Sequence, residues 1–181
     1  MLTTLDKNVA LIVIDLQHGI VALPLASSPV PVIEKSCVLL DAFRRRQLPV
    51  VLVNVAGGAP GRTEQPKRGE TPANWSVLIP EVDQQKSDIL VTKRGWGAFA
   101  NTTLAEKLKA LGVTQIVLCG ISTSIGVEST ARQAHELGFN VTLATDAMVD
   151  LNADAHTNSI ARIFPRLGET GTTAEVIALL E

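Results

Sequence analysis

Three short stretches of the chain place reactive groups directly after apolar runs. Asp15 follows the run VALIVI, Lys93 ends DILVTK, and Gly120 ends QIVLCG before a turn of small residues. A carboxylate can transfer a proton, an ammonium can orient it and stabilise developing negative charge, and amides that open a helix near Ile125 and Gly126 can bind an anion. If these groups meet, they form a proton-transfer site. The alternative is a solvated Asp15–Lys93 ion pair at the edge of a sheet.

The elements between these stretches decide whether the groups meet. Apolar runs predict strands at Val9–Asp15, Pro49–Val55, Asp88–Lys93, Gln115–Gly120, Asn140–Ala147 and Glu169–Gly171. Helical spacing and end signals predict helices over 31–46, 103–111, 127–138 and 153–164, and a last helix that runs to Leu180. Alternating strands and helices favour an α/β fold with a parallel sheet covered on both faces. Ligands of such sheets bind outside the carboxyl ends of the strands, where all three reactive stretches end.

Local signals describe two segments more closely. The pattern Thr103-x-x-Glu106 predicts a capping box at the start of one helix, and Gly112 predicts its end. This helix is predicted to carry the apolar residues Leu104, Leu108 and Leu111. The polar stretch from Ala56 to Ser87 is rich in Gly and Pro and predicts a long loop without secondary structure, a feature that often serves as a lid or binding loop.

Composition narrows the class of protein. The chain has 181 residues, 46% hydrophobic and 19% charged, which fits a single domain over residues 1–181. A net charge of −2, a pI of about 5.9 and an aromatic content of 3% argue against a nucleic-acid partner. We find no signal-peptide pattern at the N-terminus, and the longest apolar run is too short to span a membrane. We therefore expect a cytoplasmic protein that acts on a small molecule.

Cysteine and histidine usage gives no sign of a metal centre. The two cysteines, Cys37 and Cys119, cannot form a disulfide framework or a metal cluster, and both are predicted to be buried. His18, His135 and His156 do not cluster in the sequence. We therefore predict neither a metal site nor a cofactor.

Three segments together resemble the signature segments of the isochorismatase-like hydrolases, also called cysteine hydrolases. The segments are LIVIDLQHGI, VTKRGWGAF and GISTSIGVESTARQA, and the resemblance covers roughly residues 8–147. It implies a three-layer α/β/α fold with a mainly parallel, Rossmann-like doubly wound sheet, and a homodimer or higher homo-oligomer. It implies a cis peptide bond between Ile121 and Ser122. The family's Asp, Lys and Cys triad falls on Asp15, Lys93 and Gly126.

Glycine at position 126 changes the chemistry that the resemblance implies. Amidases of this family attack a carbonyl with the triad thiolate, and a glycine cannot do so. Gly126 resembles instead the cysteine-free isochorismatases, which hydrolyse a vinyl ether. In that reaction Asp15 would protonate the enol carbon, which requires a raised pKa, and Lys93 would position Asp15. Gly126 would leave room for the substrate and present its amide.

Further residues are candidates for holding a substrate of this type. Arg62 is the best placed of four basic candidates, which also include Lys67, Arg68 and Arg94, although all four can also be solvated loop charges. Trp75, Trp96 and Phe99 can wall a pocket or simply pack. Gln17 is expected to hydrogen-bond backbone near the site, and Thr123 to support the turn. The predicted substrate contacts are Gln17, Arg62, Trp96, Ile121, Ser122 and Ile125.

Two other functions remain open on the sequence. Ser122 lies in a strand–turn–helix context that superficially resembles a serine-hydrolase nucleophile elbow, with Asp146 or Asp150 and then His156 following in the chain. Alternatively, loss of the family nucleophile means loss of catalysis, which would leave a binding or structural oligomer. Retention of both Asp15 and Lys93 argues against an inactive protein, because a buried charge pair is costly to keep without use.

Overall fold

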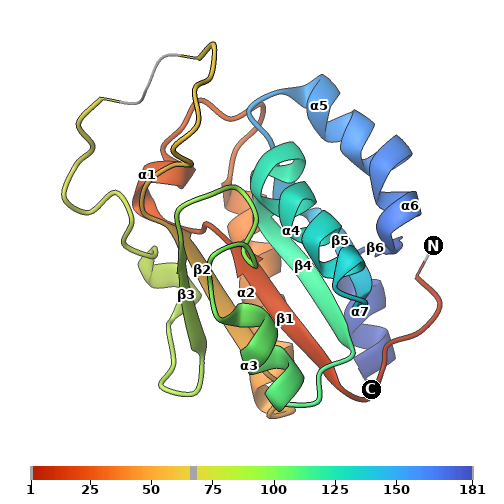
Figure 1. Cartoon of the computed structure of the whole chain (residues 1–181). Coiled ribbons are helices and arrows are strands. Elements are labelled where there is room, and N and C mark those ends of the chain that lie inside the picture. The colour runs from red at the N-terminus through yellow and green to blue at the C-terminus, as the bar shows by residue number, and fades with distance from the viewer. Residues whose placement is uncertain (1, 66–68, 181) are drawn as a thin grey trace.

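A six-stranded sheet organises the molecule, and every pair of neighbouring strands is parallel (Figure 1). The computed structural model describes residues 2–65 and 69–180. The strands are β1 (Val9–Ile14), β2 (Val50–Val55), β3 (Ile89–Lys93), β4 (Gln115–Ile121), β5 (Asn140–Val149) and β6 (Glu169–Gly171). Their order in the sheet is β3-β2-β1-β4-β5-β6, which confirms the predicted parallel α/β sheet.

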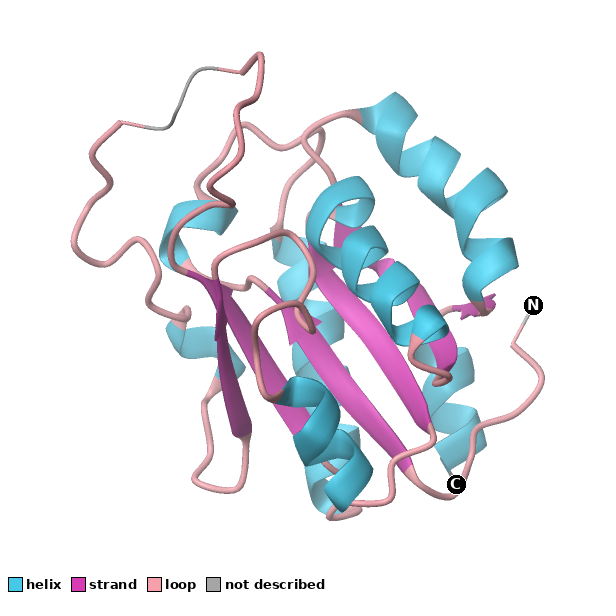
Figure 2. Cartoon of the chain, in the orientation of Figure 1, coloured by secondary structure: helices cyan, strands magenta, loops and turns pink. Residues whose placement is uncertain are grey.

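Helices cover both faces of the sheet (Figure 2). They are α1 (His18–Val21), α2 (Val30–Arg45), α3 (Leu104–Ala110), α4 (Glu128–Glu136), α5 (Ala153–Asn158), α6 (Phe164–Leu167) and α7 (Thr173–Leu180). A 3-10 turn lies at Pro80–Val82, and π-helical segments at Thr123–Val127 and Ser159–Ile163 lead into α4 and α6. The helix predicted to end at Phe164 thus continues to Leu167 through a π-helical turn.

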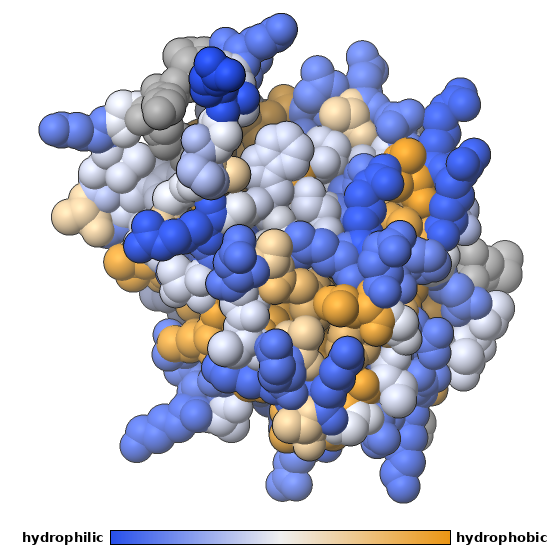
Figure 3. Space-filling model, in the orientation of Figure 1, coloured by the Kyte–Doolittle hydropathy of each residue, from blue (hydrophilic) through white to orange (hydrophobic). Residues whose placement is uncertain are grey.

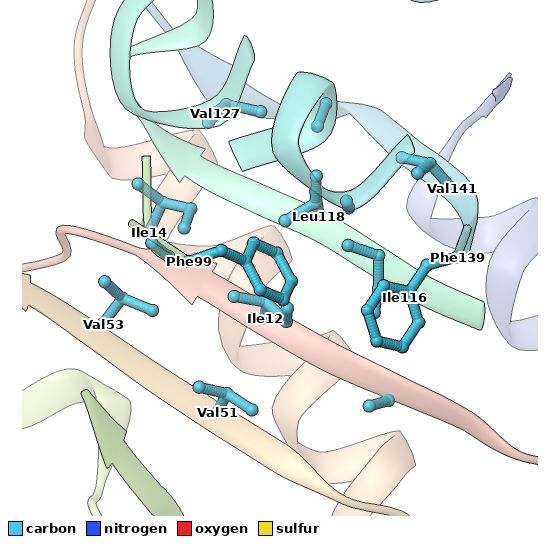
Figure 4. Close-up of a cluster of buried hydrophobic side chains, with 14 of the residues drawn as sticks. Ile12, Ile14, Val51, Val53, Phe99, Ile116, Leu118, Val127, Phe139 and Val141 are labelled. Carbon is cyan, nitrogen blue, oxygen red and sulfur yellow. The ribbon is translucent and has the colours of Figure 1, made fainter. Parts of the chain in front are cut away.

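The central strand β1 shows how the sequence builds the three layers. All six of its residues are buried, and they alternate between the two faces of the sheet. Val9, Leu11 and Val13 join a core cluster with residues of α2. Ala10, Ile12 and Ile14 join the opposite cluster with residues of α3 and α4 (Figure 4). Burying each large side chain contributes about 1.5–3 kcal/mol, so the end of β1 is firmly placed.

The start of α3 differs from the prediction. The Thr103 side chain makes no capping hydrogen bond, and its backbone (φ −93°, ψ 15°) is not in the extended conformation typical of an N-cap. The hydroxyl of Thr102 instead accepts a hydrogen bond from the Leu104 amide at 3.3 Å. Leu111, predicted to be part of this helix, lies just beyond its last residue and is 55% exposed. Gly112 follows with a φ of +69°, as expected of a glycine that ends a helix.

The segment from Ala56 to Ser87 is not free of structure along its whole length. It contains the 3-10 turn at Pro80–Val82, and Leu78 forms an antiparallel bridge with Gln17. Figure 1 shows the segment projecting beside α1, at the carboxyl ends of the strands. Its second half is therefore tied to the residues that follow β1.

The two cysteines behave differently. Cys119 is fully buried in β4, as predicted, and burial raises the pKa of its thiol to about 12. Cys37 lies on α2 and is only half-buried, and its Sγ donates to the Glu81 carbonyl at 3.1 Å.

Among the described residues, no helix is long and apolar enough to cross a membrane. On the face shown in Figure 3, apolar side chains gather near α3 and α4 and are bordered by hydrophilic ones.

Candidate active site

Asp15 and Lys93 form an ion pair across the carboxyl edge of the sheet. Ile14 pairs with Val53 of β2, and Val55, two residues further on, pairs with Lys93 of β3. At Asp15 the chain leaves β1 with a φ of 52°, while the Asp15 amide still donates to the Val53 carbonyl. The Lys93 side chain therefore crosses β2 and places its Nζ 2.7 Å from Asp15 Oδ2.

Burial makes this pair chemically unusual. The exposed fractions are 4% for Asp15 and 2% for Lys93, so the predicted alternative of a solvated pair is wrong. Lys93 Nζ also donates to the Gly95 carbonyl at 3.3 Å, whereas Asp15 Oδ1 has no hydrogen-bond partner among the described residues. Burial raises the pKa of Asp15 from 3.8 to about 6, against the charge and hydrogen bond of Lys93, which lower it. Asp15 therefore holds a proton far more readily than an ordinary aspartate.

The small-residue turn after β4 closes against the pair. The peptide bond between Ile121 and Ser122 is cis, as the resemblance implied. A Cβ placed on Gly126 would lie 3.4 Å from Asp15 Oδ2 and 2.9 Å from Ile14 Cγ2. The three strand ends therefore meet, as predicted, and Gly126 lies directly beside the carboxylate.

Two polar residues of α4, neither of them predicted from the sequence, fasten the turn and the helix after it to the loop that follows Lys93. Thr130 donates to the Gly126 carbonyl at 2.7 Å and accepts from the Ala98 amide at 3.1 Å. Gln133 accepts from the Phe99 amide at 3.0 Å. These bonds join the turn to the loop that follows Lys93. Their spacing could have indicated them, because residues three positions apart lie on the same face of a helix.

The predicted anion site at the Ile125 amide is already engaged, because this amide donates to the Ser122 carbonyl at 3.2 Å. Ile121, predicted to contact substrate, is fully buried in the core cluster on the α2 side. The physical reason is that β4 extends one residue further than the apolar run suggested. The Ile125 amide is therefore not a free donor, and the Ile121 side chain packs in the core.

Gln17 anchors the long loop with both ends of its amide. Its Nε2 donates to the carbonyls of Val55 and Trp75 at 3.0 and 2.9 Å, and its Oε1 accepts from the Val55 amide at 2.7 Å. These are the backbone hydrogen bonds predicted for Gln17, and the substrate contact predicted for it stays a prediction. The Gly19 amide adds a further bond to the Trp75 carbonyl at 2.9 Å.

Substituting Gly19 with alanine is expected to destabilise the protein by about 1–3 kcal/mol, because a new Cβ would overlap the Trp75 ring. Urea unfolding measures the change. Gly61→Ala is the matched control, since a Cβ there meets nothing within 4 Å. In a Trp75→Val background the cost of Gly19→Ala should largely disappear, and a cost that persists would show that the ring is not its cause.

The other predicted substrate contacts are spread along the exposed loops. Arg62 is exposed, and Trp96 is 65% exposed on the loop after Lys93. Phe99 is buried and stacks with Phe139 at a centroid distance of 5.8 Å. It therefore packs in the core, which was the alternative to lining a pocket. A Cβ on Gly57 would lie 3.6 Å from the guanidinium of Arg94. Lys67 and Arg68 lie outside the described residues.

Ser122 does not form a serine-hydrolase triad in this structure. Its hydroxyl donates directly to Asp150 Oδ2 at 2.8 Å. His156 Nδ1 lies 2.8 Å from the hydroxyl of Thr123, the next residue, so no imidazole stands between serine and carboxylate. Ser122, Asp150 and His156 lie in one region, but the serine contacts the aspartate directly and the histidine contacts Thr123 instead.

Two cavities lie away from this site. One of about 440 Å³ is bordered by His135, Phe139 and Arg166, and one of about 240 Å³ by Leu48 and Leu180. Both open near the amino ends of the strands, opposite Asp15. Within the described part of the chain, no group of three or more His, Cys, Asp or Glu side chains is arranged to hold a metal ion.

Known proteins resemble this chain over almost its whole length. Residues 9–175 match the family described as the isochorismatase domain. The chain is 42% identical over 188 residues to the uncharacterized isochorismatase family protein YwoC of Bacillus subtilis (strain 168), covering 98% of each. It is 42% identical over 190 residues to the uncharacterized isochorismatase family protein YecD of Escherichia coli O157:H7, covering 99% of this chain and 100% of the other. An isochorismatase family protein structure from Burkholderia thailandensis has a TM-score of 0.93 at 43% identity, covering 98% of this chain and 97% of that one.

Proposed function

This chain belongs to the isochorismatase family of hydrolases, and we propose that it hydrolyses a vinyl ether of the isochorismate type with Asp15 as the general acid. One observation carries the proposal. Asp15 is buried beside Gly126, with its Oδ2 held by Lys93 and its Oδ1 without a hydrogen-bond partner among the described residues. Leaving a buried carboxyl oxygen without a hydrogen-bond partner costs free energy. A catalytic role explains why this cost is tolerated, because Oδ1 would carry the proton that is delivered to the substrate.

The protonation state of Asp15 suits acid catalysis. With a pKa of about 6, the carboxyl group holds its proton in about half of the molecules at pH 6 and in roughly one-tenth at pH 7. An aspartate at its ordinary pKa of 3.8 would hold it in fewer than about one in a thousand at pH 7. Burial therefore raises the supply of the acid form by about a hundredfold.

The reaction can be written with this one acid. Asp15 Oδ1 transfers its proton to the methylene carbon of the enol ether, whose π electrons form the new C–H bond and leave an oxocarbenium ion. Water adds to that ion and returns a proton to the Asp15 carboxylate. The hemiketal then loses the ring alcohol and releases pyruvate. No covalent bond to the protein forms at any step.

Lys93 and Gly126 have supporting roles in this proposal. Lys93 fixes the orientation of the carboxyl group, and its charge stabilises the carboxylate left after proton transfer. Gly126 leaves space beside Asp15 where a side chain would stand. Because the pair is buried, a substrate must displace the side chains that cover it, and we place its entry beside the 56–87 segment and the loop after β3.

A cysteine-dependent route has little support from the described residues. Cys119 is fully buried in β4 with a thiol pKa raised to about 12, so it holds almost no thiolate at neutral pH. Cys37 lies on α2, and burial also raises its pKa. The homo-oligomer and the cytoplasmic location expected from the sequence stay predictions.

The proposal is tested by incubating purified protein with isochorismate and measuring pyruvate release with lactate dehydrogenase. Release with a stable turnover number supports it. No turnover of isochorismate or of other enol ethers by folded protein would overturn it and favour the non-catalytic alternative. A parallel screen with nicotinamide and other amides, on wild type and on Gly126→Cys, tests whether the scaffold supports amide cleavage once a thiol is present.

Replacing Gly126 with alanine is expected to lower kcat/KM at least tenfold and to destabilise the fold by about 1–3 kcal/mol. The new Cβ would lie 2.9 Å from Ile14 Cγ2, so the turn must move relative to Asp15. Gly58→Ala is the control, since its Cβ would meet nothing within 4 Å. Steady-state kinetics and urea unfolding measure both effects. Unchanged kinetics in Gly126→Ala would show that the space beside Asp15 is not used.

A further inference from the structure

A buried carboxylate that the proposed reaction does not use lies behind the small-residue turn. Asp150 directly follows β5 and is 2% exposed. Its Oδ2 accepts hydrogen bonds from the Ser122 hydroxyl at 2.8 Å and from the Ser124 amide at 2.6 Å. Its Oδ1 accepts from the Asn152 amide at 3.1 Å. One side chain thus gathers three donors, two of them from the turn that carries Gly126.

The charge of Asp150 is balanced by these donors. None of the ion pairs among residues 2–65 and 69–180 includes it. Burial alone would raise the pKa of Asp150, but the hydrogen bonds from Ser124, Ser122 and Asn152 together hold it below its ordinary value. Asp150 is therefore ionised at every working pH, and its hydrogen bonds are of the stronger, charge-assisted kind.

Asp150 connects the turn to two other segments. The Asn152 amide that it binds lies at the start of α5, and the Asp150 carbonyl accepts from the Ala26 amide at 2.8 Å. The nearest titratable group on α5 that contacts the turn is His156, which bonds to Thr123. The turn is therefore fastened on one side by Asp150 and on the other by Thr130, with Gly126 between them.

We propose that Asp150 is a positioning residue whose carboxylate holds the Ser122–Gly126 turn against Asp15, so that Gly126 shields this side of Asp15 from water. The catalytic consequence rests on the function proposed above, whereas the effect on Asp15 itself does not. Lys93 is the charged group that contacts Asp15, and Asp150 acts through the turn rather than through its own charge. If the turn loosens, water should reach Asp15 and remove part of the burial that favours its acid form.

The variant Asp150→Asn tests this role, because an amide cannot accept on both sides. If its oxygen faces Ser122 and Ser124, its NH2 group meets the Asn152 amide, and one donor then opposes another. The matched control is Asp146→Asn. Asp146 lies in β5, four residues before Asp150, and its Oδ1 likewise accepts two bonds from one segment, the amide and hydroxyl of Thr173 at 2.6 and 2.9 Å.

The decisive readout is the titration of Asp15 followed by carboxyl 13C NMR without substrate, assigned with Asp15→Asn. In Asp150→Asn we expect the pKa of Asp15 to fall from about 6 toward its ordinary 3.8, and in Asp146→Asn to stay. Ser122→Ala, which removes one of the two turn bonds, should give a smaller shift in the same direction and serves if Asp150→Asn does not fold. An Asp15 titration that is unchanged in a folded variant overturns the proposal.

Kinetics separate this inference from the proposed reaction. With a working isochorismate assay, Asp150→Asn should lower kcat at least tenfold with a smaller change in KM, whereas Asp146→Asn should leave both close to wild type. An unchanged kcat in folded Asp150→Asn also contradicts the positioning role. If wild type has no turnover, the proposed reaction fails, yet the shift of the Asp15 titration still decides whether Asp150 holds the turn.

Discussion

Replacing Asp15 with asparagine is expected to lower kcat/KM for isochorismate by about 10²–10⁴-fold. Asparagine keeps the shape of the side chain and can accept from Lys93, but it has no acidic proton to deliver to the enol carbon. The loss should appear at every pH, because no other carboxyl group among the described residues contacts Lys93. Steady-state kinetics at several pH values, corrected for the folded fraction, measure it.

Stability must be separated from catalysis in this variant. Asp15→Asn leaves the Lys93 ammonium buried without its counter-charge, which is expected to cost about 3–5 kcal/mol. The double variant Asp15→Asn/Lys93→Met replaces the pair with uncharged groups and should recover much of that stability. It should remain as inactive as the single variant. Recovery of activity together with stability would show that Asp15 holds the fold rather than the reacting proton.

Removing the ammonium with Lys93→Met is expected to lower kcat by about 10²-fold at pH 6, because Oδ2 loses the bond that orients the carboxyl group. The pH dependence should change as well. Lys93 lowers the pKa of Asp15, so without it that pKa rises further, and the fall in activity with rising pH begins at a higher pH than in wild type. The pH profile of kcat/KM measures both effects.

A matched pair elsewhere controls for this substitution. Arg44 and Asp88 form another ion pair, at 2.7 Å, with the carboxylate buried. Asp88 directly precedes β3, so this pair lies at the opposite end of the strand from Lys93. Arg44→Met should lower stability without moving the pH profile. A profile that moves equally in both variants would mean that the shift reflects general loosening of the fold and not the contact between Lys93 and Asp15.

The sheet and the meeting of three strand ends could be predicted from the sequence, because both follow from local runs of apolar residues. A continuous apolar run such as VALIVI fits a strand buried on both faces, and a parallel sheet brings the ends of such strands to one edge. Asp15 and Lys93 could therefore be paired although they lie 78 positions apart in the chain. Gly126 was found through its place in a motif, since a residue without a side chain carries no chemical signal of its own.

Contacts between side chains and distant backbone could not be predicted in the same way. The hydrogen bonds of Asp150 to the turn and of Thr130 to the Ala98 amide depend on how two elements pack, and local propensity says nothing about that. The capping box failed for a related reason. Thr103 has the right residue type, but the backbone entering α3 follows a path that lets Thr102 bind the helix instead.

The pH dependence of kcat/KM for isochorismate in the wild-type protein tests most directly the claim that Asp15 acts as an acid. The pKa of Asp15 predicts a profile that is level at low pH, half-maximal near pH 6, and falls about tenfold for each pH unit above that. The same profile should be absent from the residual activity of Asp15→Asn. Activity that rises with pH through this range would contradict the account, because it would show that the reaction needs a deprotonated group where we place a proton donor.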